Sequence, residues 1–101
     1  MKIYIAGKIT GDPDYKTKFG KAEEELAEKG HSVMSPAWLK EYPGFSYNDY
    51  MAVSGEMQMR CNAVLFLPDW RESNGASKEY ERATKLMQEV FFDMAKIPRV
   101  K

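Results

Sequence analysis

The chain has 101 residues, and its 15 basic and 15 acidic side chains cancel to a formal net charge of zero. It has no lysine- or arginine-rich run, so we expect no nucleic-acid polymer as a partner, whereas a small charged ligand needs only a few local donors. The length predicts a single domain over residues 1–101, with its site in loops at the edge of one core or shared with a neighbouring subunit.

The sequence also restricts the cellular compartment and the cofactors that we expect. Cys61 is the only cysteine, which excludes an intramolecular disulfide and fits a reducing compartment. No segment approaches the ~18 apolar residues of a membrane span, and no His, Cys and Asp residues have metal-ligand spacing. We therefore expect a cytoplasmic protein with no membrane partner, no metal and no organic cofactor.

In the first half of the chain, strand and helix signals alternate. Lys2–Ala6 is a short apolar run that predicts a buried strand. A helix follows, with Asp12 as its N-cap, and runs to about Lys29. His31–Met34 predicts a second strand, and residues 36–46 predict a loop because they are rich in proline and glycine.

The second half repeats the alternation. A helix is expected over about Ser46–Arg60, then a strand over the apolar run Ala63–Leu67, which suits a central parallel strand. A further helix over about Gly75–Met87 and a short strand over Val90–Phe92 follow, and the residues through Pro98 are expected to form a tail. The expected inward-facing residues of the two helices are Tyr47, Tyr50, Met51, Ser54, Met57 and Cys61, and then Ala76, Tyr80, Ala83 and Met87.

This order of elements predicts an α/β fold: a doubly wound parallel sheet with strands in the spatial order 2-1-3-4 and helices on both faces. In such a sheet the chain reverses its direction of winding between strands 1 and 3. Ligands bind at that switch point, outside the carboxyl ends of the strands. The loops that meet there are residues 7–11 and residues 68–75.

The first of these loops, Gly7–Gly11 (the first loop), is a candidate anion-binding segment. Its residues are Gly7, Lys8, Ile9, Thr10 and Gly11. The glycines allow close approach of a ligand, and Lys8 and Thr10 can donate hydrogen bonds near a helix N-terminus. It matches neither the P-loop nor the dinucleotide fingerprint, and an ordinary glycine turn after a strand is the alternative.

The second loop leads into a helix start that also suits an anion, at Ser73, Asn74 and Gly75. Glu79 follows one turn later, at the border of the buried face, where the positive end of the helix favours its ionised form. A carboxylate held near a pocket can act as a nucleophile or stabilise a cation. The alternative is an acidic residue that only complements the helix dipole.

Three segments together resemble the nucleoside 2-deoxyribosyltransferase family, over roughly residues 2–92. They are Ile3–Gly11, Gly30–Ala37, and Leu65–Trp70 leading to the pattern Ser73-x-Gly75-Ala76-x-x-Glu79. The chain looks most similar to small phage and bacterial members, and it is also similar to deoxynucleoside 5′-monophosphate N-glycosidases. The resemblance implies a Rossmann-like fold.

The resemblance also implies roles for particular residues. A glutamate at the Glu79 position attacks C1′ of a deoxyribonucleoside, as in retaining glycosidases, and a tyrosine at the Tyr4 position orients it. In the monophosphate N-glycosidases, residues at the Ser73 and Gly75 positions help to hold the 5′-phosphate. In this chain the first loop would assist them.

The chain departs from the family at the residue that protonates the leaving base. The family usually has an acid where this chain has Ser54, so Asp69 or Glu56 is the alternative proton donor. Trp70 follows a strand on the ligand side, where it can stack on a base or cover the edge of the sheet.

Three hypotheses follow. The first is an enzyme that cleaves or transfers the N-glycosidic bond of a 2′-deoxynucleoside or its 5′-monophosphate. The second is a non-catalytic module that binds a nucleotide in the same pocket, and the third is an interaction protein with a vestigial site. The partner is a small nucleoside or nucleotide in the first two. We also expect a homodimer or higher homo-oligomer, with Tyr42–Tyr50 and Phe91–Met94 as candidate interfaces.

Overall fold

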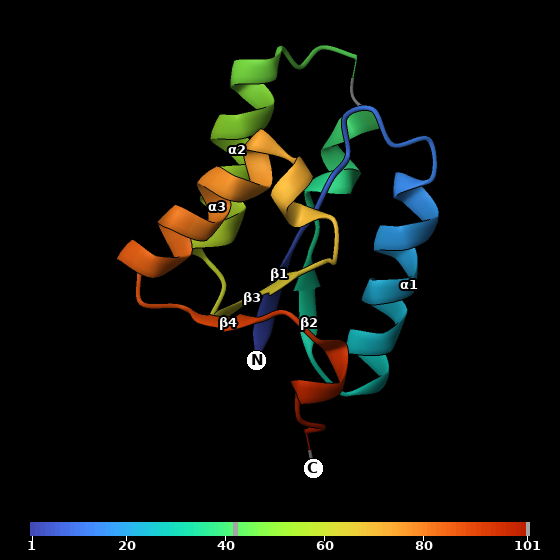
Figure 1. Ribbon diagram of the computed structural model, residues 1–101, viewed down its shortest axis with the longest axis vertical. Coiled ribbons are helices and arrows are strands. Elements are labelled where there is room, and N and C mark those ends of the chain that lie inside the picture. Colours follow the sequence, from blue (N-terminus) through green and yellow to red (C-terminus); the bar gives the residue numbers. More distant parts are fainter. Residues whose placement is uncertain (42, 101) are drawn as a thin grey trace.

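The computed structural model describes residues 1–41 and 43–100, and the strands in them form one parallel sheet (Figure 1). The strands are β1 (Lys2–Ala6), β2 (Ser32–Met34), β3 (Ala63–Phe66) and β4 (Glu89–Phe91). Their spatial order is β2-β1-β3-β4, with each neighbouring pair parallel. The predicted α/β class and strand order are therefore confirmed. The helices are α1 (Tyr15–Glu28), α2 (Tyr47–Met59) and α3 (Asn74–Lys85).

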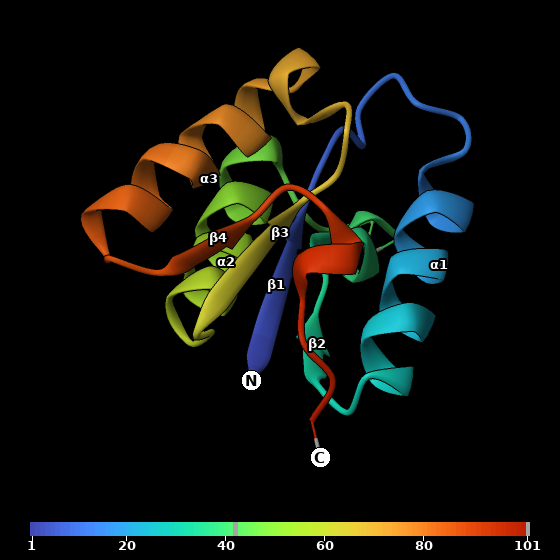
Figure 2. The same ribbon diagram turned by 60° about the horizontal axis from the view of Figure 1, so that its bottom comes forward.

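The sheet lies between two helical layers, with α1 on one face and α2 and α3 on the other (Figure 2). Side chains of β1 alternate between these layers, as a pleated strand requires. Ile3 and Ile5 belong to the cluster that packs under α1, whereas Tyr4 and Ala6 belong to the cluster under α3. The central strands are buried on both faces, which explains their unbroken apolar sequence.

Helix α1 packs through the apolar stripe that its sequence predicts, and Phe19, Ala22 and Leu26 are buried. Burial of a Phe or Leu side chain stabilises a fold by roughly 1.5–3 kcal/mol. The predicted N-cap, Asp12, is wrong by two residues. The N-cap is Asp14, because a carboxylate oxygen of Asp12 accepts from the backbone N–H of Asp14 and tightens the turn before the helix.

Helix α2 begins with a capping box in which Ser46 and Asp49 satisfy each other's backbone N–H groups. Its buried residues are Ser54, Gly55 and Gln58. Ser54 is therefore inward as predicted, but Tyr47, in the first turn, is 56% exposed, contrary to prediction. The buried side of the helix is thus lined by small and polar groups rather than by a continuous apolar stripe.

Helix α3 is shorter than predicted, and two of its predicted inward residues are exposed. The helix ends at Lys85, and Met87 lies beyond it with a positive φ of 58° and 90% exposure. Tyr80 is also partly exposed, because the buried face of the helix runs through Ala76, Glu79 and Ala83. The core side of α3 therefore contains a carboxylate.

The segments outside the regular helices are more ordered than the sequence predicts. The expected loop over residues 36–46 contains a short 3-10 helix, Pro36–Glu41, and further 3-10 helices form at Trp70–Glu72 and, after β4, at Met94–Lys96. The expected tail instead packs on the domain, where Ile97 is buried and the ammonium group of Lys29 donates to two carbonyls of this segment. No helix in residues 1–41 and 43–100 combines the length and apolar character needed to cross a membrane.

Candidate active site

A buried carboxylate lies on the inner face of α3. Glu79 is 5% exposed and faces the sheet, where the hydroxyl of Tyr4 from β1 donates a hydrogen bond to its Oε2 atom. Tyr4 is fully buried on the same side of the sheet as α3. The structure therefore brings together the two residues that the sequence analysis assigns as nucleophile and orienting group.

The environment of Glu79 changes its proton affinity. Burial raises the pKa of Glu79 from 4.5 to about 7, against the opposing effects of the Tyr4 hydrogen bond and the positive charge of Arg82. The carboxyl group is therefore divided between its two protonation states near neutral pH. Such a group can act as a nucleophile in its ionised form, and it gains that form as the pH rises through 7.

The phenols near this carboxylate stay protonated. Burial first, and then the negative charge of Glu79, raises the pKa of Tyr4 well above 10, while a hydrogen bond with Ser54 lowers it. Burial and the charge of Glu79 also raise the pKa of Tyr50 on α2 well above its ordinary value. Both rings are thus neutral, and Tyr4 donates its proton to Glu79 in the hydrogen bond.

Ser54 lies beside this pair but offers no acidic proton. It is 1% exposed on α2, and it interacts with the Tyr4 hydroxyl and with the carbonyl oxygen of Met51, 3.3 Å away. Glu56, one of the two alternative proton donors, is on the exposed side of α2, where it pairs with Arg60. The structure therefore does not bring Glu56 to the buried carboxylate.

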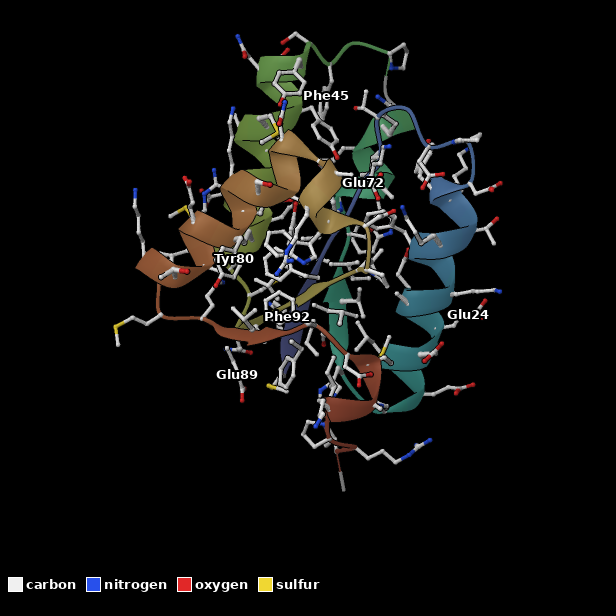
Figure 3. All side chains as sticks on the ribbon, viewed as in Figure 1. Glu24, Phe45, Glu72, Tyr80, Glu89 and Phe92 are labelled. Carbon is white, nitrogen blue, oxygen red and sulfur yellow. The ribbon has the colours of Figure 1, made fainter. Side chains whose placement is uncertain are left out.

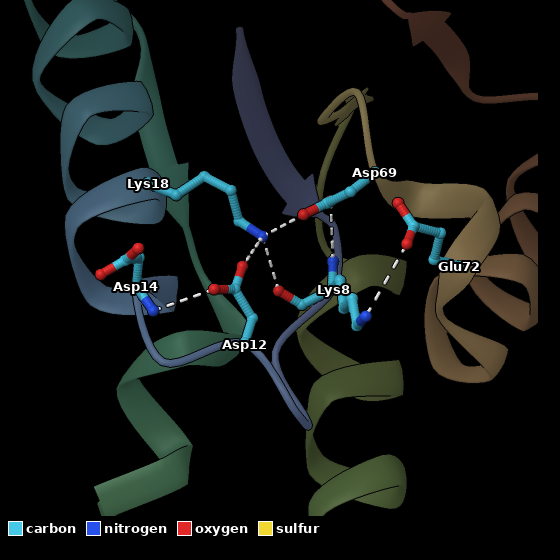
Figure 4. Close-up of polar contacts among 6 residues, drawn as sticks. All are labelled: Lys8, Asp12, Asp14, Lys18, Asp69 and Glu72. Atoms are coloured by element: carbon cyan, nitrogen blue, oxygen red, sulfur yellow. Dashed lines mark hydrogen bonds and ion pairs between the residues drawn. The ribbon is translucent and has the colours of Figure 1, made fainter.

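The first loop is fixed by a three-way anchor on Lys18 of α1 (Figure 4). The Lys18 ammonium donates to the carbonyl of Lys8 at 2.8 Å and to the carboxylates of Asp12 and Asp69. Asp69 also accepts from the backbone N–H of Lys8 at 3.1 Å. This anchor joins the loop after β1 to the loop after β3 at the switch point of the sheet.

The position of Asp69 argues for a structural role. One carboxylate oxygen is held by the Lys8 N–H and the other by the ammonium of Lys18. Gly7 is tightly packed against the same loop, since a Cβ atom there would lie 3.0 Å from Leu67 and 3.3 Å from the Asp69 carboxylate. Asp69 thus orders the first loop and pairs with a lysine instead of facing Glu79.

Two cavities adjoin at this edge of the sheet and share Thr10 and Tyr47. The larger, about 330 Å³, also receives residues from the start of α3, and the other, about 290 Å³, receives residues that precede and begin α2. The lining residues are Thr10, Tyr47, Glu72, Ser73, Asn74 and Gly75 for the larger, and Thr10, Leu39, Lys40, Pro43, Phe45, Ser46, Tyr47 and Tyr50 for the other. Together they form a cleft of the size of a small ligand site.

The predicted binding residues divide between this cleft and the core. Ile9 is buried in the core cluster under α1, so its side chain does not face the cleft. Ser73 caps α3 through its hydroxyl, which accepts from the N–H of Ala76, and it lines the cleft. The side chain of Lys8 points to Glu72, with 3.8 Å between the charged atoms (Figure 4). Gly11 is exposed at the turn that leads to α1.

Trp70 lies in an aromatic cluster instead of lining the two cavities. Its ring stacks on Tyr80 at 5.1 Å between centroids, and it also contacts Phe66 and Phe92. Figure 3 labels Tyr80 on α3 and Phe92 just after β4, the edge strand of the sheet, and their ring centroids are 6.1 Å apart. This geometry therefore favours the interpretation that Trp70 covers the edge of the sheet over the one in which it stacks on a base.

Several residues that shape the site were not expected to do so from the sequence. Lys18 and Asp12 hold the first loop, and Tyr50 lines the cleft and interacts with Glu79. Gln58 donates to the backbone carbonyl of Glu79, and Arg82 donates to the side chain of Gln58. Gln58 follows Ser54 by one helical turn, so its place on the buried side could have been inferred. In residues 1–41 and 43–100, no group of three or more His, Cys, Asp or Glu is placed to hold a metal ion.

Comparison with solved structures identifies the same fold in other proteins, with nine matching chains. One is a 2-deoxyribosyltransferase from the psychrotolerant bacterium Bacillus psychrosaccharolyticus, with a TM-score of 0.71 and 24% sequence identity. The match covers 89% of this chain and 69% of that chain. The fold implied by the sequence resemblance is therefore confirmed.

Comparison with curated proteins finds no match. A family model described as "Domain of unknown function (DUF4406)" matches residues 1–92, which is most of the chain and includes every candidate site residue. The chain belongs to this family, the DUF4406 domain of unknown function.

Proposed function

We propose that this protein cleaves or transfers the N-glycosidic bond of a 2′-deoxynucleoside or its 5′-monophosphate, with Glu79 as the nucleophile. The observation that carries the proposal is the buried Glu79 carboxylate, which accepts a hydrogen bond from Tyr4 and whose charge acts on Tyr50, a residue that lines the cleft. The fold shared with a 2-deoxyribosyltransferase supports the same chemistry.

In the proposed reaction, Tyr4 holds the Oε2 atom of Glu79, and Oε1 attacks C1′ of the sugar. A bond forms between Oε1 and C1′ while the bond between C1′ and the base nitrogen breaks, and its electron pair leaves with the base. Water or a second base then attacks C1′ and releases the carboxylate, so the configuration at C1′ is retained overall.

The departing base needs a proton, and this chain has Ser54 where the nucleoside 2-deoxyribosyltransferase family that the sequence resembles usually has an acid. We propose that water in the open cleft supplies this proton, because Asp69 is held by Lys18 and Glu56 by Arg60. The reaction is then slower for bases that leave poorly as anions. Base preference would follow leaving-group acidity more closely than in an enzyme with an internal acid.

The cleft offers donors for the sugar or its 5′-substituent. Thr10 from the first loop and Ser73, Asn74 and Gly75 at the start of α3 line one cavity. The N-terminus of a helix favours an anion through its free N–H groups and its dipole. We propose that this end of the cleft holds the 5′-hydroxyl or 5′-phosphate.

The proposal is tested by chromatography of free base released from a panel of deoxynucleosides and their 5′-monophosphates. Release by the parent and its loss in Glu79→Gln is the expected result. The matched control is Glu81→Gln, which removes an exposed carboxylate from the same helix and should retain activity. Equal rates for the parent and Glu79→Gln would refute the role of Glu79.

A second candidate is a module that binds a nucleotide in this cleft without cleaving it. The observation that favours it is Ser54, a buried serine beside Tyr4 at the position where the nucleoside 2-deoxyribosyltransferase family that the sequence resembles usually has an acid. This candidate predicts a higher melting temperature with nucleotide but no base release over hours. A protein with a vestigial site would show neither effect.

We further propose that the protein forms a homodimer or higher homo-oligomer. Phe45 and Tyr47 are exposed apolar residues at the rim of the cleft, and Phe92 is exposed at the edge of the sheet. Tyr42, at the start of the first expected interface, lies outside the described residues. Light scattering at increasing concentration checks this proposal, and a constant monomer mass would contradict it.

A further inference from the structure

A fully buried amide connects α2 to the backbone of α3 at Glu79. Gln58 is 0% exposed, and its Nε2 atom donates to the carbonyl oxygen of Glu79 at 2.8 Å. Its Oε1 atom accepts from the guanidinium of Arg82 at 3.0 Å. Glu79 and Arg82 are three residues apart on α3, so both lie on one side of the helix.

The orientation of this amide is fixed by its other partner. Gln58 Nε2 also donates to Oε1 of Gln88 at 3.2 Å, and Gln88 donates in return to the carbonyl oxygens of Gln58 and Cys61 at 2.8 and 2.9 Å. A flipped Gln58 would point its NH2 group at the donors of Arg82 and its oxygen at the carbonyl of Glu79. The network therefore permits one orientation, in which Gln58 presents an acceptor to Arg82.

The space for the Arg82 guanidinium depends on a glycine. A Cβ atom at Gly55 would lie 3.2 Å from both Cζ and one terminal nitrogen of Arg82, closer than an ordinary contact. Gly55 is buried on α2, one turn before Gln58. The guanidinium therefore donates a hydrogen bond to Gln58 in one turn of α2 and lies against the backbone of Gly55 in the preceding turn.

We propose that Arg82 is a positioning residue for the reaction: Gln58 and the space at Gly55 hold its guanidinium beside the turn of α3 that carries Glu79, where it places a positive charge near the nucleophile. The catalytic consequence rests on the proposed function. The electrostatic link between Arg82 and Glu79 does not, because it is a property of the folded protein.

The other groups that face Glu79 do not supply this positive charge. Tyr4 from β1 and Tyr50 from α2 are phenols whose pKa values are raised, so both are neutral. Arg82 lowers the pKa of Glu79 through its charge, and burial raises it. If the guanidinium were lost, the hydrogen bond from Tyr4 would be the main remaining effect that lowers the pKa of Glu79 against burial.

The direct test is a carbon-13 NMR titration of the Glu79 side-chain carboxyl in the full chain. Arg82→Gln should raise the pKa of Glu79 by roughly one pH unit, the effect of removing one nearby charge. Arg82→Lys keeps a positive charge and should restore most of the parent value. Lys85→Gln, which removes an exposed cation one turn further along α3, should leave the pKa unchanged.

The activity test uses the same variants in base-release assays at several pH values. In Arg82→Gln the acidic limb of the pH profile should move upward by the same amount, so that kcat at pH 6 falls about tenfold. Arg82→Lys should restore the limb, which a purely structural role of the arginine does not predict. Gly55→Ala, a milder displacement of the guanidinium, should move the limb in the same direction by less.

The outcomes separate this inference from the proposed function. An unchanged Glu79 titration in Arg82→Gln would overturn the inference whatever the activity. A shifted titration without base release from any substrate would support the link between Arg82 and Glu79 and count against the proposed function. If Arg82→Gln does not fold, the titration of Gly55→Ala decides: a raised pKa of Glu79 would support the inference, and the parent value would refute it.

Discussion

Replacing Glu79 with glutamine should make the stability of the protein less dependent on pH. Burial raises the pKa of Glu79 from 4.5 to about 7 in the folded state, so the folded protein binds this proton more tightly than the unfolded chain. Stability from this group is therefore greatest below pH 4.5 and is lost as the pH rises to 7. The difference corresponds to about 3 kcal/mol of unfolding free energy across that window.

The substitution preserves the shape of the side chain and an oxygen that can accept from Tyr4, but it removes the titration. Relative to the parent, Glu79→Gln should therefore gain about 2.5 kcal/mol in unfolding free energy between pH 5 and pH 8. Urea unfolding at both pH values, followed by circular dichroism, measures this gain. Glu81→Gln, which changes an exposed carboxylate of the same helix, is the control and should show little change.

The sign of the effect makes the test decisive. If the difference in unfolding free energy between the parent and Glu79→Gln is the same at pH 5 and pH 8, Glu79 has an ordinary pKa in the folded state. If the parent instead becomes more stable relative to Glu79→Gln as the pH rises, the folded state stabilises the carboxylate. Either result would refute the argument that burial dominates at this position.

Three further substitutions test other parts of the site. Tyr4→Phe removes the hydrogen bond to Glu79, so the acidic limb of the pH profile should move upward and kcat should fall at least tenfold, measured by base release. Lys18→Met removes the anchor of the first loop. Amide hydrogen exchange in that loop should become faster, and KM should rise more than kcat falls. Unchanged exchange would argue against the anchor. Glu72→Gln frees the ammonium of Lys8 from its ion pair. The preference for 5′-monophosphates over nucleosides, measured as the ratio of their kcat/KM values, should then increase severalfold. An unchanged ratio would mean that Lys8 does not reach the phosphate.

Much of the fold could be predicted because its signals are local and strong. The unbroken apolar run that forms β3 suits only a strand covered on both faces, and the alternation of strands and helices restricts the topology to few choices. The strand order then places the first loop beside the start of α3 without any motif. The pairing of Tyr4 with Glu79 came from the family resemblance and not from periodicity.

The errors arise where tertiary packing overrides spacing. An apolar stripe predicted Tyr47 and Met87 inward, but the start of α2 opens to the cleft and α3 ends before Met87. The tail was expected to be free because nothing local indicates its contacts, although Ile97 packs in the core. Position on a helix face alone could not show that Gln58 and Arg82 bond across two helices.

The role of Lys18 shows the same limit for charges. It lies 10 residues from Lys8 and 51 from Asp69 along the chain, yet its ammonium binds both. Such a contact depends on how two loops meet at the switch point, which composition and spacing do not encode. Asp69 is one of the two alternative proton donors expected from the sequence, and its contacts with Lys8 and Lys18 indicate that it holds the first loop.

The most direct test of the central claim is mass spectrometry of the protein quenched during reaction with a deoxynucleoside or its 5′-monophosphate. We expect a peptide that contains Glu79 and carries one additional deoxyribosyl group, or a deoxyribosyl 5-phosphate when the substrate is the monophosphate, and Glu79→Gln should lack it. Base release by the parent, with the sugar attached to a different residue or with inversion at C1′ and no adduct, would contradict the account.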